Sequence, residues 1–202
     1  MRLKGSGLAY HYGKGEWLFR GMDIELEAGE VVGLVGPSGC GKSTLGRLLA
    51  GYSQPVEGRV TLDGMPLPTK GYHPVQLVLQ HPEKAVNPRW TMRRTLREGY
   101  APDHALLAAF GIEASWLDRW PNELSGGELQ RVCVVRALGP DTRFLIADEM
   151  TTMLDAITQA QLWHALLNIA KQRNMGVLVI SHERYLLERV CSRVLSFTPD
   201  IP

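Results

Sequence analysis

The sequence predicts an α/β domain in which helices flank a mostly parallel sheet. Three short, continuous apolar runs, at residues 31–35, 144–147 and 177–180, have the composition of strands that are buried on both faces. Helical spacing of apolar residues follows the first two runs, and it predicts helices that begin near residue 42 and span residues 156–171. With 202 residues, the chain is long enough for one such domain.

The N-terminal part has a different pattern. Residues 8–30 contain short strand-like stretches, and residues 22–26 alternate apolar and acidic side chains before a turn at 28–29. Further short strands are expected at residues 58–64, which glycines bound, and at residues 75–79. The predicted fold class therefore adds an antiparallel β-layer to the parallel core.

A glycine-rich loop joins the first buried strand to the first helix. Its sequence, GPSGCGKST, has the spacing of the phosphate-binding P-loop: glycine, four residues, glycine, lysine and serine. Glycines let backbone N–H groups turn toward phosphates, the lysine supplies a positive charge, and the serine hydroxyl is a ligand for Mg²⁺. A glycine-rich turn without a ligand is the alternative, which the strand before the loop and the helix after it disfavour. We therefore predict a P-loop NTPase core that binds nucleotide through Gly36, Pro37, Ser38, Gly39, Cys40, Gly41, Lys42, Ser43 and Thr44.

Two acidic residues follow the apolar run at 144–147. Asp148 and Glu149 are expected at the carboxyl edge of the sheet, where open α/β folds bind ligands. We expect Asp148 to hold Mg²⁺, directly or through water, and Glu149 to polarise the water that attacks the γ-phosphate. Acids that end a strand are also common as solvated turn residues, but the P-loop upstream favours the functional interpretation.

Residues 81–135 have the composition of a small helical insert. Prolines separate short helical pieces that are expected at residues 92–98 and 104–110. The sequence LSGGELQR at 124–131 opens another helix, with Ser125 as its N-cap and Glu128 completing a capping box. A well-capped helix alone explains this pattern, although the exposed N–H groups at a helix start also bind phosphate.

These motifs, in this order, resemble those of the ATP-binding subunits of ABC transporters, over essentially the whole chain. The resemblance rests on the P-loop, Gln80, LSGGELQR, the strand that ends in Asp148 and Glu149, Asp155 and His182. In that family two ATPase subunits bind two nucleotides between them, with the P-loop of one subunit facing the LSGGE-type signature of the other. The resemblance implies that Ser125, Gly126 and Gly127 contact the γ-phosphate held by a partner subunit.

The same resemblance implies roles for four further residues. Gln80 senses Mg²⁺ and the attacking water at the hinge of the insert, and Asp155 lines the seam between the two ATPases. His182 contacts the γ-phosphate and orients Glu149, although a histidine that ends a strand is otherwise more often structural. Tyr12 stacks on the adenine ring, with an ordinary half-buried strand tyrosine as the alternative.

A narrower resemblance concerns the segment that begins at Gln80. Residues 80–82 and 85–89, QHP and AVNPR, are similar to the ATPases of peptide and nickel importers, as is QAQ at 159–161. This implies an ATPase that uses ATP and Mg²⁺ to power the import of peptides, nickel or metal chelates. The implied partners are a second ATPase subunit, of the same or a different chain, integral membrane permease subunits and, indirectly, a substrate-binding protein. The implied location is peripheral, at the cytoplasmic face of the cell membrane.

Composition limits the other function classes. A formal net charge of +1 gives no general nucleic-acid-binding field, so we expect no nucleic acid partner. No apolar run approaches the roughly 20 residues that cross a bilayer, so we expect no transmembrane segment. The length of the chain suits a single ATPase domain over residues 1–202. Besides the importer ATPase, a second hypothesis is a soluble ABC-type ATPase that acts on nucleic acid or protein complexes. The third, a P-loop kinase, would need an acceptor site and a lid in place of the signature.

Two positions depart from the family pattern. Met150 stands where a proline usually follows the catalytic glutamate, and Met153 stands where a small residue is usual. Both departures leave Asp148, Glu149 and Asp155 in place, and we expect them to change the fine geometry of the seam. The chain also stops at Pro202, where the family commonly continues, so we expect no role that depends on a C-terminal tail.

Overall fold

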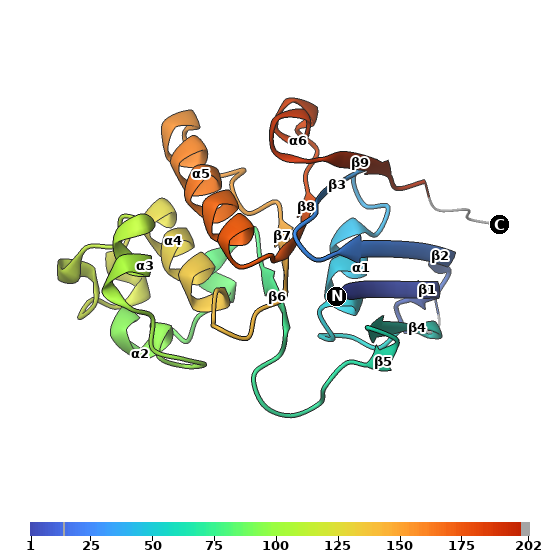
Figure 1. Ribbon diagram of the computed structural model, residues 1–202, viewed down its shortest axis with the longest axis horizontal. Helices are drawn as coiled ribbons and strands as arrows, with labels where there is room; N and C mark the ends of the chain where they lie inside the picture. Colours follow the sequence, from blue (N-terminus) through green and yellow to red (C-terminus); the bar gives the residue numbers. More distant parts are fainter. Residues whose placement is uncertain (14, 199–202) are drawn as a thin grey trace.

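A parallel sheet forms the centre of the protein (Figure 1). The computed structural model describes residues 1–13 and 15–198. Five strands pair in parallel in the order β6-β7-β8-β3-β9. Every residue of β7 and β8 is buried, as their apolar composition predicts, so the mostly parallel core is confirmed. The bounds are β3 Val31–Val35, β6 Val75–Val78, β7 Phe144–Asp148, β8 Gly176–Ile180 and β9 Arg193–Ser196.

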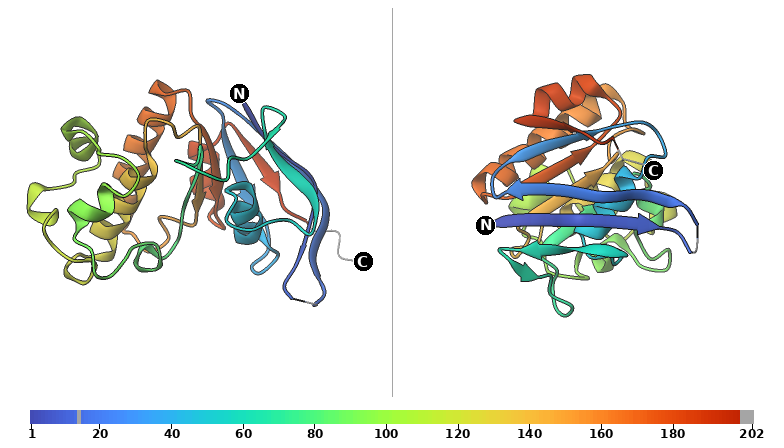
Figure 2. Two further views of the ribbon diagram at one scale, coloured as in Figure 1. Left: turned by 90° about the horizontal axis from the view of Figure 1, so that it is seen from below. Right: turned by 90° about the vertical axis from the view of Figure 1, so that its right-hand side faces the viewer.

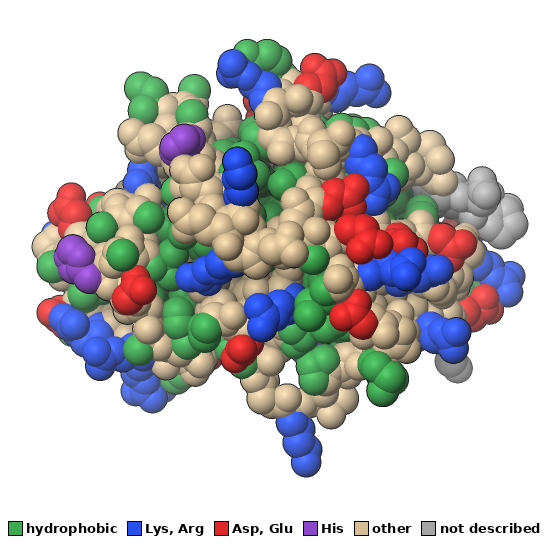
Figure 3. Space-filling model, viewed as in Figure 1, with side chains coloured by type: hydrophobic (Ala, Val, Ile, Leu, Met, Phe, Trp, Pro, Cys, Tyr) green, Lys and Arg blue, Asp and Glu red, His purple; other side chains and the backbone are tan. Residues whose placement is uncertain are grey.

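The N-terminal residues contribute most of a second, antiparallel sheet with the strand order β2-β1-β4-β5. Exposed ion pairs join its strands, such as Arg2 with Glu25 and Arg20 with Glu57, and Figure 3 shows basic and acidic side chains interspersed over this part of the surface. The expected antiparallel layer is confirmed, although its first strand begins earlier than the expected position 8. The bounds are β1 Arg2–His11, β2 Trp17–Glu27, β4 Glu57–Leu62 and β5 Met65–Pro66.

Helix α1, Lys42–Leu49, lies between the two sheets (Figure 2). Its Leu45, Leu48 and Leu49 are buried in one apolar cluster with Phe19 of β2 and Ile146 of β7. Burial of each leucine stabilises the folded chain by about 1.5–3 kcal/mol. The loop before α1 is therefore anchored by a helix that packs against both sheets.

The other face of the parallel sheet is covered by helices, and the described residues between β6 and β7 contain no strand. Both helical pieces expected here are present, and they end slightly before the predicted residues. The last helix of this stretch runs on to Ala137. The bounds are α2 Met92–Leu96, α3 His104–Ala109, α4 Gly126–Ala137, α5 Ala156–Gln172 and α6 Arg184–Val190, with short 3-10 helices at Pro82–Lys84, Ala114–Trp116 and Pro121–Glu123.

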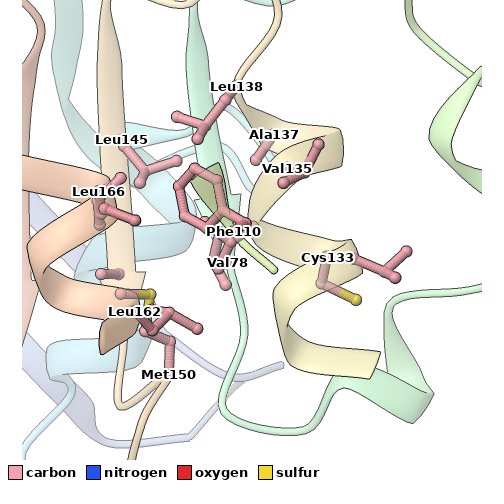
Figure 4. Close-up of a cluster of buried hydrophobic side chains, with 14 of the residues drawn as sticks. Val78, Phe110, Cys133, Val135, Ala137, Leu138, Leu145, Met150, Leu162 and Leu166 are labelled. Atoms are coloured by element: carbon pink, nitrogen blue, oxygen red, sulfur yellow. The ribbon is translucent and has the colours of Figure 1, made fainter. Parts of the chain in front are cut away.

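These helices and the sheet share one core. Figure 4 shows Phe110, at the end of α3, packed among Leu138, Leu145 of β7 and Leu162 of α5. Met150 lies in the same core and is only 3% exposed, so the residue that stands in place of the usual proline packs inward. Within residues 1–13 and 15–198, no helix combines the length and apolarity needed to cross a membrane.

Candidate functional site

A cavity of about 740 Å³ opens beside the P-loop and the carboxyl ends of β6, β7 and β8. Loops that follow parallel strands converge at this edge, which is where open α/β sheets bind ligands. Segments far apart in the sequence contribute to it, including the turn between β1 and β2. The lining residues are Tyr12, Leu18, Ser38, Gly39, Gly41, Lys42, Ser43, Thr44, Gln80, Glu149 and His182.

All of these residues except Leu18 belong to the set that the sequence predicts. Leu18 lies on β2, and its only sequence signal is a place in the strand-like region that also carries Tyr12. Gly36, Pro37 and Cys40 belong to the same loop without lining the cavity.

Two glycines of the P-loop are required by its shape. Gly41 precedes α1 with a φ of 107°, in the region that favours glycine. A Cβ on Gly36 would lie 2.6 Å from the carbonyl oxygen of Phe197, so the loop passes close to the chain after β9. Helix α1 then points its N-terminal N–H groups toward the cavity, an arrangement that attracts anions.

Lys42 is folded onto its own loop. Its Nζ donates hydrogen bonds of 2.8 Å to the carbonyl oxygens of Gly36 and Pro37, and it lies 3.9 Å from Cys40 Sγ. The lysine is only 7% exposed. An ammonium group binds an anionic oxygen more strongly than a neutral carbonyl, so a phosphate in the cavity can replace these carbonyls as the partner of Lys42.

Asp148 does not line the cavity itself but lies directly behind Ser43, which does. Ser43 Oγ donates a 2.9 Å hydrogen bond to Asp148 Oδ1, and Asp148 is only 5% exposed. Burial raises the pKa of Asp148, with Glu149 adding to the rise, while the Ser43 hydrogen bond and the Lys42 charge oppose it. A buried carboxylate of this kind is stabilised by a cation.

This donor set fits Mg²⁺ only together with a nucleotide. The described residues contain no group of three His, Cys, Asp or Glu side chains that could hold a metal by themselves. Mg²⁺ is commonly bound through one or two carboxylates plus substrate phosphates. The oxygens of Ser43, Asp148 and Gln80 match that mode of binding.

Glu149 and His182 meet across two loops. Glu149 directly follows β7 and His182 lies shortly after β8, and Glu149 Oε2 is 3.3 Å from His182 Nδ1. Glu149 has a φ of 48°, an uncommon conformation for a residue with a side chain. Its N–H donates to the carbonyl of Ile180 at 2.9 Å, and Thr152 Oγ1 donates to its carbonyl at 2.9 Å. These bonds aim the carboxylate at the cavity.

Gln80 lies between the end of β6 and the 3-10 helix Pro82–Lys84. It lines the cavity directly after Leu79, whose carbonyl accepts a 3.1 Å hydrogen bond from Gln130 Nε2 of α4. The end of the strand is thereby tied to the helix that carries the signature.

Tyr12 lies at the rim of the cavity. Its hydroxyl shares a 2.7 Å hydrogen bond with Thr44 Oγ1, and its ring meets Tyr10 edge-on at 5.1 Å. At 58% exposed, and just beyond the end of β1, it is not a half-buried strand tyrosine. An aromatic ring beside a phosphate-binding loop is suited to contact a planar base.

The signature residues lie elsewhere. Ser125, Gly126 and Gly127 line a separate pocket of about 550 Å³, together with Asp155, and no P-loop residue borders it. The predicted capping box is present, since Ser125 N–H donates to Glu128 at 2.6 Å and Glu128 N–H donates to Ser125 Oγ at 3.3 Å. Hydrogen bonds from Ser125 lower the pKa of Glu128.

Asp155 has a structural role that the sequence analysis did not include. It is the N-cap of α5, and its Oδ1 accepts 3.0 Å hydrogen bonds from the N–H groups of Ile157 and Thr158. The neighbouring Met153 is 66% exposed. Within one chain, the structure thus brings the P-loop, Gln80, Glu149 and His182 together, and leaves the signature and Asp155 at a second place.

Comparison with known proteins gives consistent matches. Residues 19–152 match the family model described as ABC transporter. The nickel import ATP-binding protein NikE of Shigella sonnei (strain Ss046) is 37% identical over 220 residues, which cover 96% of this chain and 82% of that protein. NikE of Escherichia coli (strain K12) is 37% identical over 217 residues, with coverage of 94% and 81%.

Solved structures share the fold. The dimeric structure of MJ0796, a bacterial ABC transporter cassette, matches with a TM-score of 0.80 at 22% sequence identity, covering 96% of this chain and 94% of that chain. A bacterial Atm1-family ABC exporter with ATP bound matches with a TM-score of 0.81 at 25% identity, covering 98% of this chain and 37% of that chain.

Proposed function

The chain belongs to the ABC transporter family of ATP-binding proteins, and we propose that it hydrolyses ATP to power import of nickel, a metal chelate or a peptide. One observation supports the ATPase most directly. The P-loop and the Glu149–His182 pair line one cavity, and the buried Asp148 bonds Ser43 from behind its wall. The nickel import proteins that match most of the chain support the choice of substrate class.

The proposed reaction is hydrolysis of the γ-phosphoryl group. Glu149 accepts a proton from water, the water oxygen bonds to the γ-phosphorus, and the bond from that phosphorus to the bridging oxygen breaks. The products are ADP and inorganic phosphate. His182, 3.3 Å from the Glu149 carboxylate, would keep it aimed at the water and contact the γ-phosphate. Gln80, which lines the cavity with Glu149, would contact the same water.

The P-loop would bind the triphosphate. Its backbone N–H groups from Gly36 to Thr44 and the start of α1 supply donors, and Lys42 would exchange its two carbonyl partners for phosphate oxygens. Mg²⁺, held by Ser43, Asp148 and Gln80 when bound, would neutralise phosphate charge. Tyr12 would stack on the adenine ring, which requires its hydroxyl to leave Thr44.

The second pocket supports a site built from two chains. We propose that Ser125, Gly126, Gly127 and Asp155 contact nucleotide held by the P-loop of a second ATPase subunit, because no P-loop residue of their own chain borders them. The MJ0796 cassette, which shares this fold, has a dimeric structure. A closed pair would then be favoured by contacts that both nucleotides make only in that state.

The proposed partners beyond the ATPase pair are integral permease subunits, which receive substrate from a separate substrate-binding protein. The proposed location is peripheral, at the cytoplasmic face of the cell membrane. Residues 1–202 would act as one ATPase domain, with the insert 81–135 as the part that contacts the permease. Nucleic acid has no place in this function.

A pull-down with a trapped variant tests the proposal. Glu149→Gln keeps the shape of the side chain but removes the base, so turnover should fall roughly 10²–10⁴-fold while ATP binding remains. Tagged wild-type and Glu149→Gln proteins are purified from source-cell membranes with and without MgATP, and the co-purifying proteins and the ATPase rate are measured. Glu188→Gln serves as the matched control, since Glu188 is exposed on α6 and does not line the cavity.

A polytopic membrane protein in the eluate supports the transporter assignment, and a second ATPase identifies a heterodimer. Soluble partners or nucleic acid alone would overturn it in favour of a soluble ABC-type ATPase. Near-normal turnover in Glu149→Gln would refute the role of Glu149.

A further inference from the structure

The geometry of the Glu149–His182 pair depends on how two separate loops are held. Glu149 follows β7, and His182 follows β8. The His182 side chain is 63% exposed, so packing does not restrain it. The 3.3 Å contact between Glu149 Oε2 and His182 Nδ1 therefore needs a restraint from outside the pair.

Gln159 joins the two loops. It lies in the first turns of α5 and is half-buried. Its Nε2 donates to Thr151 Oγ1 at 3.0 Å and to Glu183 Oε2 at 3.2 Å. Thr151 follows Glu149 closely in the sequence, and Glu183 is the neighbour of His182. Across residues 1–13 and 15–198, no other side chain outside the Glu149–His182 pair hydrogen-bonds to both loops.

Each acceptor of Gln159 is itself anchored. Thr151 is 3% exposed, and its Oγ1 also accepts a 3.2 Å hydrogen bond from the buried Trp163 Nε1. Glu183 N–H donates to Ser181 Oγ at 3.0 Å. Gln159 therefore links two restrained loops, so a displacement of one loop would also shift the other.

We infer that Gln159 is a positioning residue that keeps Glu149 and His182 in register for ATP hydrolysis, an inference that rests on the proposed function. Gln159 does not line the nucleotide cavity. Its side chain should therefore affect turnover and leave ATP binding unchanged. An effect on turnover appears in kcat, and an effect on ATP binding appears in KM.

The first test is Gln159→Ala in the complex that the tagged chain carries out of source-cell membranes. Gln159→Ala removes the hydrogen bonds to Thr151 and Glu183, and a net loss of about 0.7–1.4 kcal/mol in the positioning of the pair predicts a kcat roughly three- to tenfold lower, with the KM for ATP unchanged. Gln161→Ala is the matched control, because Gln161 lies on the same helix and accepts its 3.0 Å hydrogen bond from Arg131 instead. Its kcat should stay near that of the wild type.

A polarity swap distinguishes positioning from a general structural role. Gln159→Glu places a carboxylate against Glu183 and should lower kcat more than Gln159→Ala does, because like charges repel. Adding Glu183→Gln to that chain reverses the bond between the two side chains, and the Thr151 hydroxyl can donate to the new carboxylate, so kcat should recover. Glu183→Gln alone retains an amide oxygen that accepts from Gln159, so it should remain nearly as active as the wild type.

The outcomes separate this inference from the proposed function. A wild-type complex without ATPase activity overturns the proposed function. An active wild type with equal kcat in Gln159→Ala and Gln161→Ala overturns the positioning role alone. If Gln159→Ala is slow but the swap does not recover kcat, the side chain is structural only and the inference also fails. Thermal unfolding of each variant excludes a general loss of folding as the cause.

Discussion

The backbone conformation of Glu149 lowers the free energy of unfolding, and two substitutions can measure by how much. Its φ of 48° lies in the left-handed region, which costs an L-residue about 1–2 kcal/mol relative to glycine. Glycine in turn loses about 0.5–1 kcal/mol more backbone entropy on folding than alanine does. The difference predicts that Glu149→Gly is more stable than Glu149→Ala by about 0.5–1 kcal/mol.

The comparison of these two variants isolates the backbone. Both remove the carboxylate, so the loss of the His182 contact cancels between them. Both keep the N–H that bonds the Ile180 carbonyl and the carbonyl that accepts from Thr152 Oγ1. An exposed helical position serves as the reference, because Ala160→Gly in α5 should destabilise by about 1 kcal/mol.

The assay is thermal unfolding of the nucleotide-free chain, followed by tryptophan fluorescence. For a chain of this size, about 1 kcal/mol shifts Tm by about 2–4 °C. Glu149→Gly should therefore unfold above Glu149→Ala by about 1–4 °C, while Ala160→Gly unfolds below the wild type. If glycine is the less stable residue at both positions, Glu149 is not held in a strained conformation and the reasoning is wrong.

Three further predictions concern binding and pH. Lys42→Ala should weaken ATP binding at least tenfold in a fluorescent-nucleotide titration, since a charge-assisted contact to phosphate is worth roughly 1.5–3 kcal/mol, and the exposed Lys171→Ala is the control. Asp148→Asn should raise the Tm of the nucleotide-free chain at pH 7, because burial raises the pKa of Asp148 and so penalises its charged form in the folded state. That penalty is present above the folded-state pKa and fades as the pH falls toward the ordinary value of about 3.9, so the gain in Tm should shrink in the same window; a gain that is constant with pH would contradict this cause. Tyr12→Ala should lower ATP affinity about tenfold through lost stacking, whereas Tyr12→Phe, which removes only the hydroxyl bonded to Thr44, should bind at least as tightly as the wild type.

The sequence predicts the elements with strong periodicity. The buried strands β7 and β8, helix α1 and the capping box at the start of α4 are all confirmed, because each depends on local composition or on a short motif. The short elements β5 and α6 were not predicted. β5 has only two residues, both exposed, and α6 has seven, too few for an apolar period to stand out.

Other features of the site depend on the tertiary fold. The P-loop and the strand-ending acids could be recognised from the sequence; Glu149 lines the cavity with the P-loop, and Asp148 lies behind it, bonded to Ser43. Nothing local indicates that Leu18 lines it or that the Tyr12 hydroxyl bonds Thr44, because both depend on how the antiparallel sheet packs over α1. The capping role of Asp155 could have been inferred, since an aspartate before a helix is a strong N-cap.

Asp148 and Glu149 point to function even without the motifs. They are consecutive, the first is a buried carboxylate with a raised pKa, and the second has a positive φ, so both lower the stability of the nucleotide-free chain. They directly follow the fully buried Phe144–Ala147 between two hydrogen-bonded neighbours, a setting that is stable enough to tolerate the strain. Selection for stability alone would favour an amide and a glycine at these positions. A cation at Asp148 and an aimed carboxylate at Glu149 are what a phosphoryl-transfer site requires, and that requirement explains both residues together.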